Sequence, residues 1–570
     1  MSTKEIKKDK IKKKSNKQGF LQSVITLMFS QVLIKLLGMI YTLYLTNRQG
    51  FGDEGNGIVS SSYQIYAMLL TISSIGVPNA ISKLVSEKVA IGDHKGAHRI
   101  FKIAFATFAV IGLIGSLMLF CGAHMIAYNW LQIPQAEMTL VALSPAIFFV
   151  AISSVMRGYC NGRQNIKATA RSQTLEQIFK TALTIIIVEI VAIISNVSTE
   201  WMAAGATLAT TIATFAGFGY LYMYYKVIRK EIKAEIDSTV NYKYERVKTI
   251  IKKVLLVSMP IALTAIMSSL NKNIDSFTVV RSLKQFLPEK EALAQYGILG
   301  GKVDMLTSLP LSINVAFSTA LVPAIAAAKA KKDKKTITKK TSFSILISTL
   351  IGLPCTIGMC IFAEPILHLL FPNASAGATI LQISSLTILF TILDQTINGA
   401  LQGYGKLMIP AISLGVGVIA KLILNIILVP NPVFGVNGAA WASVVCHVIA
   451  FTIASTALRK NIKLDLTFSK IVLKPVIATG IMGVLSYYTY ILLNGIIPQN
   501  LATIIAMIVA VIIYGISIIA LKIFTKEEIL EIPGGAKILK ILEKVKIYWS
   551  FLGRVKKGSP KIKIKLDVKF

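Results

Sequence analysis

The stretch LATIIAMIVAVIIYGISIIAL, residues 501–521, decides the class of fold because it contains no charged side chain. A run of about 20 apolar residues can cross the roughly 30 Å hydrocarbon core of a bilayer as an α-helix. Similar runs recur along the whole chain, of which 54% is apolar and only 15% is charged. A soluble protein usually has about a quarter of its residues charged. The pattern predicts an all-α polytopic membrane protein with about 14 transmembrane helices.

The apolar runs place the expected helices between residues 20 and 523. They lie at residues 20–46, 58–85, 99–121, 138–158, 174–195, 201–227, 253–279, 294–325, 341–363, 376–401, 408–429, 437–458, 471–493 and 501–523. The chain then divides into regions of different charge. These are a basic tail (1–19), an N-terminal six-helix lobe (20–227), a basic linker (228–252), a C-terminal six-helix lobe (253–458), two further helices (471–523) and a second basic tail (524–570).

The formal net charge of +34 is distributed unevenly along the chain. Lys and Arg are dense before residue 20 and in every second loop, at residues 95–102, 157–171, 226–253, 329–340 and 459–474. Because cytoplasmic loops carry an excess of Lys and Arg, this alternation predicts a plasma-membrane protein with both termini in the cytoplasm. Residues 281–290 are a basic exception on the outside. The excess of Lys and Arg in cytoplasmic loops accounts for the positive net charge, so no nucleic acid partner is predicted.

The two halves of the chain resemble each other at an offset of roughly 235 to 245 residues. SSIGVPNAISK (73–83) resembles TALVPAIAAAK (319–329), and IFKTAL (178–183) resembles IAKLIL (419–424). Both copies begin on the same side, which predicts parallel repeats related by an axis along the membrane normal. Two lobes with a central cleft form a transporter architecture. We expect the prolines of the first pair, and the lysines of the second pair, to occupy equivalent positions.

Charged residues inside the apolar runs are the candidates for function. Each costs roughly 2.5–3.5 kcal/mol at a helix centre on insertion scales, so each needs a physical reason. Lys35, Lys302 and Lys421 lie deep and have no evident partner in their own helix. An excess of deep cations over deep anions favours a cleft that holds phosphate. We therefore expect these three lysines to bind the substrate, the alternative being that each belongs to an internal ion pair.

Other charges within the expected helices are assigned supporting or ion-pairing roles. Glu176 and Lys180 are four residues apart, so we expect them to pair on one face of their helix. The remaining members of this group are Asp304, Asp275, Arg157 and Asp394. The alternative for each is a side chain that extends to the membrane surface.

Several chemistries lack the residues that they require. No GxxxxGK[ST] phosphate-binding motif is present, so transport is expected to be passive or driven by a coupling ion or the membrane potential. His94 and His98 have no further metal ligands nearby, and the five cysteines show no metal-ligand spacing. No catalytic residue, metal or cofactor is predicted, and the chain is expected not to be an enzyme. A transferase site built on Asp53, Glu54 and Glu200 is a distant alternative.

Seven motifs occur in order along the chain. They are QVLIKLLGMIY (31–41), GNGIVSSSYQIY (55–66), SSIGVPNAISKLVSE (73–87), MRGYCNGRQN (156–165), SQTLEQIFK (172–180), NIDSFTVVRSL (273–283) and GKVDMLTSLPLSINVAFSTALVPAI (301–325). Together they resemble the polysaccharide-transporter branch of the multidrug/oligosaccharidyl-lipid/polysaccharide (MOP) exporter superfamily. The most similar group is that of stage V sporulation protein B and the YtgP/MurJ-type flippases.

The resemblance implies a fold of two six-helix lobes around a central cleft, with two extra helices. It implies alternating-access flipping of an undecaprenyl-pyrophosphate-linked sugar, lipid II of peptidoglycan being the leading candidate, with basic cleft residues engaging the pyrophosphate. Relatives often carry an Arg where this chain has Thr42, which leaves Lys35 as the substitute. The alternative is a cation-coupled multidrug exporter of the same superfamily. That chemistry favours acidic groups in the N-terminal lobe, whereas residues 20–46 contain none.

Overall fold

A computed structural model describes residues 33–74, 76–163, 165–194, 198–237, 239, 244–464, 467–525 and 528–529. These residues form helices joined by short connections, and no strand occurs among them. Ten helices in this part of the chain are long and apolar enough to cross a membrane. The chain is therefore a multi-pass helical membrane protein, and the total of fourteen spans stays a prediction. The tail 1–19 and residues 530–570 lie outside the described residues.

The N-terminal lobe starts with a helix at Leu33–Asn47. The following elements are α2 (Gly52–Ser74), α3 (Val77–Ala90), α4 (His94–Met125), η1 (Ile126–Leu131), η2 (Pro134–Ala136), α5 (Glu137–Gly162), α6 (Ile166–Ile194) and α7 (Thr199–Asp237). In this lobe α4 and α7 both pack against α5, and α6 packs against α7. Because α7 continues past the apolar run, the first part of the expected linker is helical.

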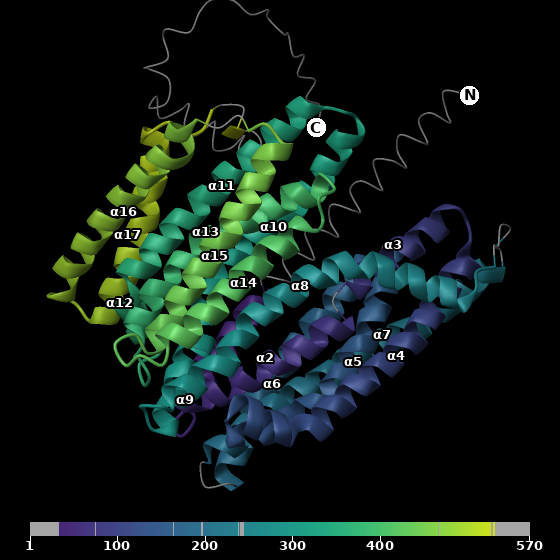
Figure 1. The fold of residues 1–570 in the computed structure, drawn as a ribbon, viewed down its shortest axis with the longest axis horizontal. Helices are drawn as coiled ribbons and strands as arrows, with labels where there is room; N and C mark the ends of the chain where they lie inside the picture. Colours follow the sequence, from purple (N-terminus) through teal and green to yellow (C-terminus); the bar gives the residue numbers. More distant parts are fainter. Residues whose placement is uncertain are drawn as a thin grey trace, which may run out of the picture.

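The C-terminal lobe contains most of the remaining helices (Figure 1). They are α8 (Val247–Leu283), α9 (Glu289–Gly297), α10 (Asp304–Ala330), α11 (Lys334–Ile361), α12 (Ala363–Leu370), α13 (Ala378–Gly403), α14 (Ile409–Leu428) and α15 (Val436–Asn461). The π-helical turn η3 (Ile298–Val303) joins α9 to α10. After η4 (Ser469–Leu473), helices α16 (Lys474–Asn494) and α17 (Gln499–Ala520) pack together along the side of this lobe.

The expected helix at residues 58–85 is divided into α2 and α3. Gly76 separates them with a φ of 91°, a left-handed conformation that glycine adopts at little cost. Pro78 lies in the first turn of α3, where its missing N–H would have no helical partner. Apolarity alone therefore predicted the span but not its break.

Glycines on α5 and α13 bring the packing helices of each lobe into close contact. Gly158 and Gly162 lie against α3, and Gly399 and Gly403 lie against α10. At all four positions an added Cβ would lie within 3 Å of a backbone carbonyl oxygen on the facing helix. Small residues spaced four apart allow such close approach in membrane helices. The same contact in both lobes supports the parallel repeat.

These glycine contacts also give the register of the repeat. Gly158 meets the carbonyl of Pro78, and Gly399 meets that of Ser318. The expected equivalence of Pro78 with Pro323 is therefore wrong by five positions. The segments around the two prolines have similar residues, but the break before α3 shifts the register of α3 relative to that of α10.

A second pair of contacts supports the expected equivalence of the lysines in α6 and α14. Gly205 of α7 packs on Ile187 of α6, and Gly438 of α15 packs on Leu428 of α14. Counting back seven residues from Ile187 and from Leu428 reaches a lysine in each helix. The two lysines thus occupy corresponding places in the two lobes.

Helices α2 and α8 form most of the contact between the lobes. Helix α2 packs against α8, α9 and η3, and glycines at this crossing leave no room for a side chain. Helix α8 crosses from one lobe to the other: it contacts α3 and α4 near its start and α14 further along (Figure 1). Both helices carry many polar residues, so the interface between the lobes is rich in polar side chains.

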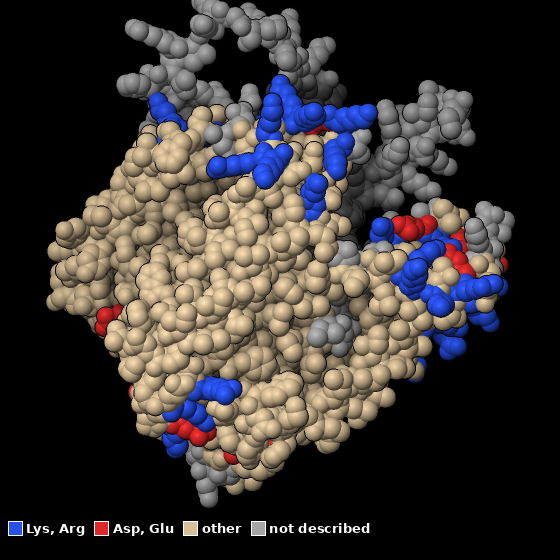
Figure 2. Space-filling view, viewed as in Figure 1, with Lys and Arg blue, Asp and Glu red and all other residues tan. Residues whose placement is uncertain are grey.

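Lys and Arg gather at one end of both lobes, which we call the basic end. Figure 2 shows two separate clusters there, one over the ends of α10, α11 and α15 and one over the ends of α3, α4 and α7. A smaller group lies at the opposite end beside α9, within residues 281–290, which include the end of α8, the connection and the start of α9. The grouping agrees with the alternation of basic loops along the sequence.

Candidate functional site

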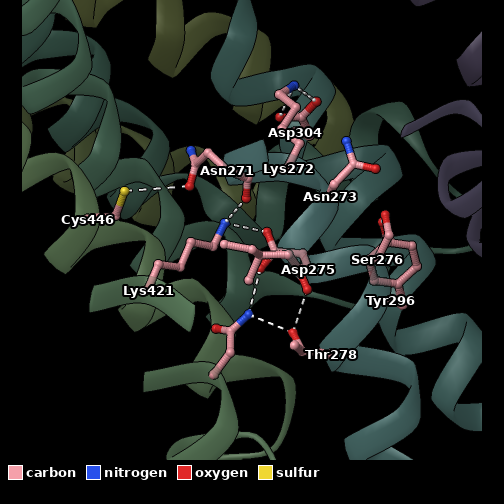
Figure 3. A network of polar contacts seen from close by, with 12 residues as sticks. Asn271, Lys272, Asn273, Asp275, Ser276, Thr278, Tyr296, Asp304, Lys421 and Cys446 are labelled. Carbon is pink, nitrogen blue, oxygen red and sulfur yellow. Dashed lines mark hydrogen bonds and ion pairs between the residues drawn. The ribbon is translucent and has the colours of Figure 1, made fainter. Parts of the chain in front are cut away.

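A buried ion pair joins α14 to α8 (Figure 3). The Lys421 ammonium donates to Asp275 Oδ2 at 2.6 Å and to the Asn271 carbonyl at 2.8 Å. Asn425 donates to the other oxygen of Asp275 at 2.9 Å and to Thr278 at 2.9 Å. Lys421 is only 2% exposed. A buried charge is stable only when it is paired and hydrogen-bonded, and this network provides both.

The surroundings of Lys421 differ from those expected. We predicted an ammonium facing a cleft, whereas Lys421 is enclosed by protein oxygen atoms within the C-terminal lobe. The sequence did identify Asp275 as a supporting charge. It could not show the pairing, because the two residues are 146 positions apart and their helices are not consecutive.

A second buried ion pair connects the two lobes near the opposite end. The Lys302 ammonium donates to Asp53 of α2 at 2.9 Å and to the carbonyls of Ala374 and Ala376 at 2.6 and 2.9 Å. An ammonium has three hydrogens, so all its donors are used. Lys302 is fully buried, and Asp53 is 13% exposed. We call Lys302 and Asp53 the interlobe pair.

The expectation that Lys302 contacts substrate from an open cleft is not met in this conformation. Its three partners leave no donor for a ligand, and α2 covers it from the other lobe. The residue lies at the boundary between the lobes, as a cleft residue would. Asp53, which the sequence offered only as a distant transferase candidate, is its partner.

The expected pair of Glu176 and Lys180 is wrong. Glu176 accepts a hydrogen bond from Arg157 of α5 at 2.6 Å, and Arg157 also donates to Ser172 at 3.1 Å. Lys180 points away to two aromatic rings instead. The spacing along α6 allowed the pair, but Arg157 of α5 bonds one oxygen of the Glu176 carboxylate through a single guanidinium nitrogen.

Lys180 lies between Tyr41 and Tyr63. Its ammonium is 5.1 Å from the centre of the Tyr41 ring and 4.8 Å from that of Tyr63. Tyr41 belongs to the first helix and Tyr63 to α2, so three helices of the N-terminal lobe meet here. Such cation–π contacts are weaker than an ion pair, and Lys180 also interacts with the Tyr41 side chain by a hydrogen bond.

Lys272 of α8 approaches the same place from the C-terminal lobe. It bonds Asp304 at 2.9 and 2.6 Å, and the Lys272 and Asp304 side chains are 46% and 41% exposed (Figure 3). Tyr63 interacts electrostatically with both Lys272 and Lys180. These side chains lie where α8 packs against α2, at the contact between the lobes. We call Lys180, Lys272, Tyr41 and Tyr63 the central basic site.

Sequence reasoning did not select Lys272, although the signal was present. It lies in NKNIDS (271–276) within an expected helix, where the same argument of depth applies as for Lys421. Asp304 was expected to support the site and does so as the partner of Lys272. Asp304 is thus the carboxylate bonded to one of the two ammonium groups of the central basic site. Glu176 and Asp275 lie nearby and are bonded to other cations, Arg157 and Lys421.

The remaining predicted residues lie apart from this site. Lys35 is exposed on the first helix, and it has no ion pair among the described residues. Asp394 is buried in α13 and accepts a hydrogen bond from Asn398 at 2.8 Å, so its partner is an amide and not a cation. The described ranges contain no group of three or more metal-ligating side chains.

Comparisons with known proteins agree with this architecture. A family model described as polysaccharide biosynthesis protein matches residues 20–329, more than half of the chain, and a MatE model matches residues 260–427. The chain is similar to stage V sporulation protein B of Bacillus subtilis (strain 168), with 27% identity over 527 residues that cover 91% of this chain and 98% of the relative.

Two further similarities concern a lipid flippase. Lipid II flippase MurJ of Bacillus subtilis (strain 168) is 25% identical over 426 residues, which cover 72% of this chain and 77% of that protein. A solved structure of lipid II flippase MurJ in an inward closed conformation superposes with a TM-score of 0.64 at 15% identity. It covers 86% of this chain and 98% of that one, so the fold is shared.

Proposed function

Because the chain belongs to the polysaccharide biosynthesis protein family, we propose that it is a flippase for an undecaprenyl-pyrophosphate-linked sugar, most specifically the lipid II precursor of peptidoglycan. The observation that carries this proposal is the central basic site, in which an ammonium from each lobe lies beside Tyr63 at the contact between the lobes. Relatives that move lipid-linked sugars support the choice of substrate. The chain would act in the plasma membrane, with the basic end and both termini in the cytoplasm.

The pyrophosphate is the part of the substrate that this site can recognise. Lys180 and Lys272 each offer hydrogen-bond donors to phosphate oxygens, and charge-assisted hydrogen bonds are roughly twice as strong as neutral ones. Tyr41 and Tyr63 add two hydroxyl donors beside the ammonium of Lys180. Asp304 would compete for Lys272, so phosphate binding draws this lysine from an exposed ion pair that has little net stability.

Lys35 extends the positive charge toward the basic end. It lies on the same helix as Tyr41 and about two turns closer to the start of the chain. An anionic headgroup that arrives from the cytoplasmic leaflet would meet Lys35 before the central basic site. Lys35 therefore keeps the role that its depth suggested, as a phosphate contact.

Alternating access would use the interlobe pair as the closure of the opposite end. Lys302 and Asp53 hold the lobes together there, while Lys272 of the central basic site is 46% exposed. When the lobes separate at this end, Lys302 would lose Asp53 and its ammonium could meet the phosphate on the way out. Lys421 stays bonded to α8 and keeps α14 in place during this motion.

The membrane potential would favour the proposed direction. Moving one elementary charge through 100 mV changes its energy by about 2.3 kcal/mol, and an inside-negative potential drives an anion outward. A pyrophosphate headgroup carries more than one negative charge at neutral pH. No nucleotide-binding motif is then needed.

Depletion of the protein in growing cells tests the substrate class. If the proposal is correct, undecaprenyl-pyrophosphate-linked sugar accumulates in the cytoplasmic leaflet, and expression of the chain with both Lys180→Gln and Lys272→Gln does not reverse this. A multidrug exporter would instead leave precursor levels unchanged and alter the retention of a cationic dye. That second outcome would overturn the proposal.

A further inference from the structure

A separate hollow lies at the basic end of the C-terminal lobe, away from the contact between the lobes. It has a volume of about 1060 Å³ and is formed by the start of α11, the end of α15 and the connection to α16. These segments are far apart in the sequence but converge on one space. The central basic site shares no residue with this hollow, so the proposed substrate route does not account for it.

The hollow is strongly positive. Seven of its lining side chains are Lys or Arg, from residues 334–339 and 459–470, and one is a carboxylate. That carboxylate, Glu528, is already bonded to Lys470 at 2.6 and 2.8 Å. Among the residues that the structure describes, the basic side chains of the lining therefore outnumber the acidic ones by seven to one. Such a concentration of charge attracts an anion of more than one negative charge.

The hollow has a buried floor and fixed walls, so it is a pocket and not a flat surface from which lysines extend. Ile337 and Ile462 are buried at its base, and Thr338 donates to the carbonyl of Lys463 at 2.8 Å. This bond fixes the start of α11 against the chain that follows α15. The cations are thus carried by segments held at a set separation.

Apolar side chains beside the hollow indicate its depth relative to the bilayer. Phe468 is 73% exposed, and Leu473 is 48% exposed on η4 next to the lining residue Lys470. Aromatic and aliphatic groups next to lysines are typical of the membrane–water interface. An occupant could therefore place a phosphate group in the hollow while an acyl chain lies against η4.

We propose that this hollow binds a phosphate group at the membrane surface, as carried by an anionic phospholipid or by a small soluble phosphate ester. Lysine and arginine side chains from α11 and from the connection between α15 and η4 would surround the phosphate. The site is independent of the lipid-linked sugar proposed above. It would bind its ligand whether or not the central basic site is occupied.

The test uses the full chain, purified in a zwitterionic detergent, and measures ligand retention by native mass spectrometry. The probes are phosphatidylglycerol, phosphatidylcholine and glycerol 3-phosphate. The variant carries Lys335→Gln, Arg459→Gln and Lys463→Gln. The control carries Arg229→Gln, Lys230→Gln and Lys233→Gln on α7, which are exposed, remove the same charge and lie at the basic end of the other lobe.

We expect wild type to retain phosphatidylglycerol over phosphatidylcholine if the source is a lipid, or glycerol 3-phosphate if it is soluble. The variant in the hollow should weaken that binding at least about tenfold, because each cation near the surface contributes to phosphate attraction. The control should change it less than about twofold. Equal losses in both variants, or wild-type binding by the hollow variant, overturn the proposal. Unchanged thermal melting shows that each variant is folded.

Discussion

Replacing Asp53 with Asn should open the end of the protein that the interlobe pair closes. The substitution keeps the shape of the side chain but removes the charge that Lys302 faces at 2.9 Å. Lys302 is fully buried here and is left with neutral acceptors, the amide oxygen of Asn at position 53 and the Ala374 and Ala376 carbonyls. If the lobes separate at this end, the ammonium regains water. The substitution therefore penalises the closed state and leaves the open state nearly unchanged.

The size of this effect follows from the contacts. Removing one partner of a buried ion pair costs about 3–5 kcal/mol. The cost falls below this range because Asp53 is 13% exposed and Lys302 keeps neutral oxygen acceptors. We take a cost of about 2–3 kcal/mol after allowing for those acceptors. Since 1.4 kcal/mol is tenfold, the equilibrium should move toward the open state by roughly 30- to 150-fold.

The assay is a distance measurement by double electron–electron resonance. Spin labels at Gln49 and Ser375 report on the opposite end, since the two positions are exposed and belong to different lobes. The background replaces the five native cysteines and must retain transport. Asp53→Asn should convert a short distance population into a longer one, and Asp53→Glu should preserve the short one.

A matched control removes an ion pair at the same end but within one lobe. Glu137→Gln breaks the pair with His124, whose 3.2 Å contact is largely exposed. An exposed pair contributes about 0–1 kcal/mol, so the distance distribution should not change. If Asp53→Asn leaves the short population intact, or if the control shifts it equally, the interlobe pair does not hold this end closed.

Three further predictions concern stability, each measured on the purified chain. Lys421→Met should lower the free energy of unfolding by denaturant by about 3–5 kcal/mol, and adding Asp275→Asn should recover much of this loss. If Lys421→Met alone leaves the free energy of unfolding unchanged, the buried pair does not stabilise the fold. Gly399→Ala should cost about 1–3 kcal/mol, because its Cβ would lie 2.8 Å from a carbonyl oxygen, while Gly219→Ala meets open space and should be neutral. A hydrogen bond from a lysine of α8 holds the pKa of Glu245 below its ordinary 4.5. The charged carboxylate of Glu245 therefore stabilises the start of α8 above pH 4.5, and this stabilisation is lost as the pH falls through the lowered pKa. Glu245→Gln should abolish the corresponding acid dependence of thermal melting.

The sequence predicted the class of fold because apolar runs and basic loops are local signals. The parallel repeat was also readable, since α6 and α14 place Lys180 and Lys421 at corresponding positions. The register of the two prolines could not be predicted from the sequence. The glycine break before α3 changes how many residues separate the prolines from the helix contacts, and it leaves the apolar composition unchanged. Sequence similarity therefore located the repeat but not its exact alignment.

The site was predicted only in part, for a physical reason. Depth along a helix can be read from the sequence, so Lys302 and Lys421 were correctly identified as unusual. Their partners lie 249 and 146 residues away, and only the fold brings them together. Lys421 meets Asp275 of α8, whereas the equivalent Lys180 meets Tyr41 of the first helix. Because a tyrosine stands in place of the carboxylate, Lys180 has among the described residues no direct ion pair of the kind that holds Lys421, which supports the ligand-binding role that we propose for it.

The most direct test of the proposed function is translocation in reconstituted liposomes with an inside-negative potential. The substrate is a fluorescent undecaprenyl-pyrophosphate-linked sugar, and its appearance in the outer leaflet is measured by an impermeant quencher. The account predicts rapid translocation by wild type, loss of it in Lys272→Gln, and normal translocation in Lys230→Gln, which removes an exposed charge on α7. Wild-type liposomes that do not move this lipid, or a Lys272→Gln variant that moves it at the wild-type rate, would contradict the central claim.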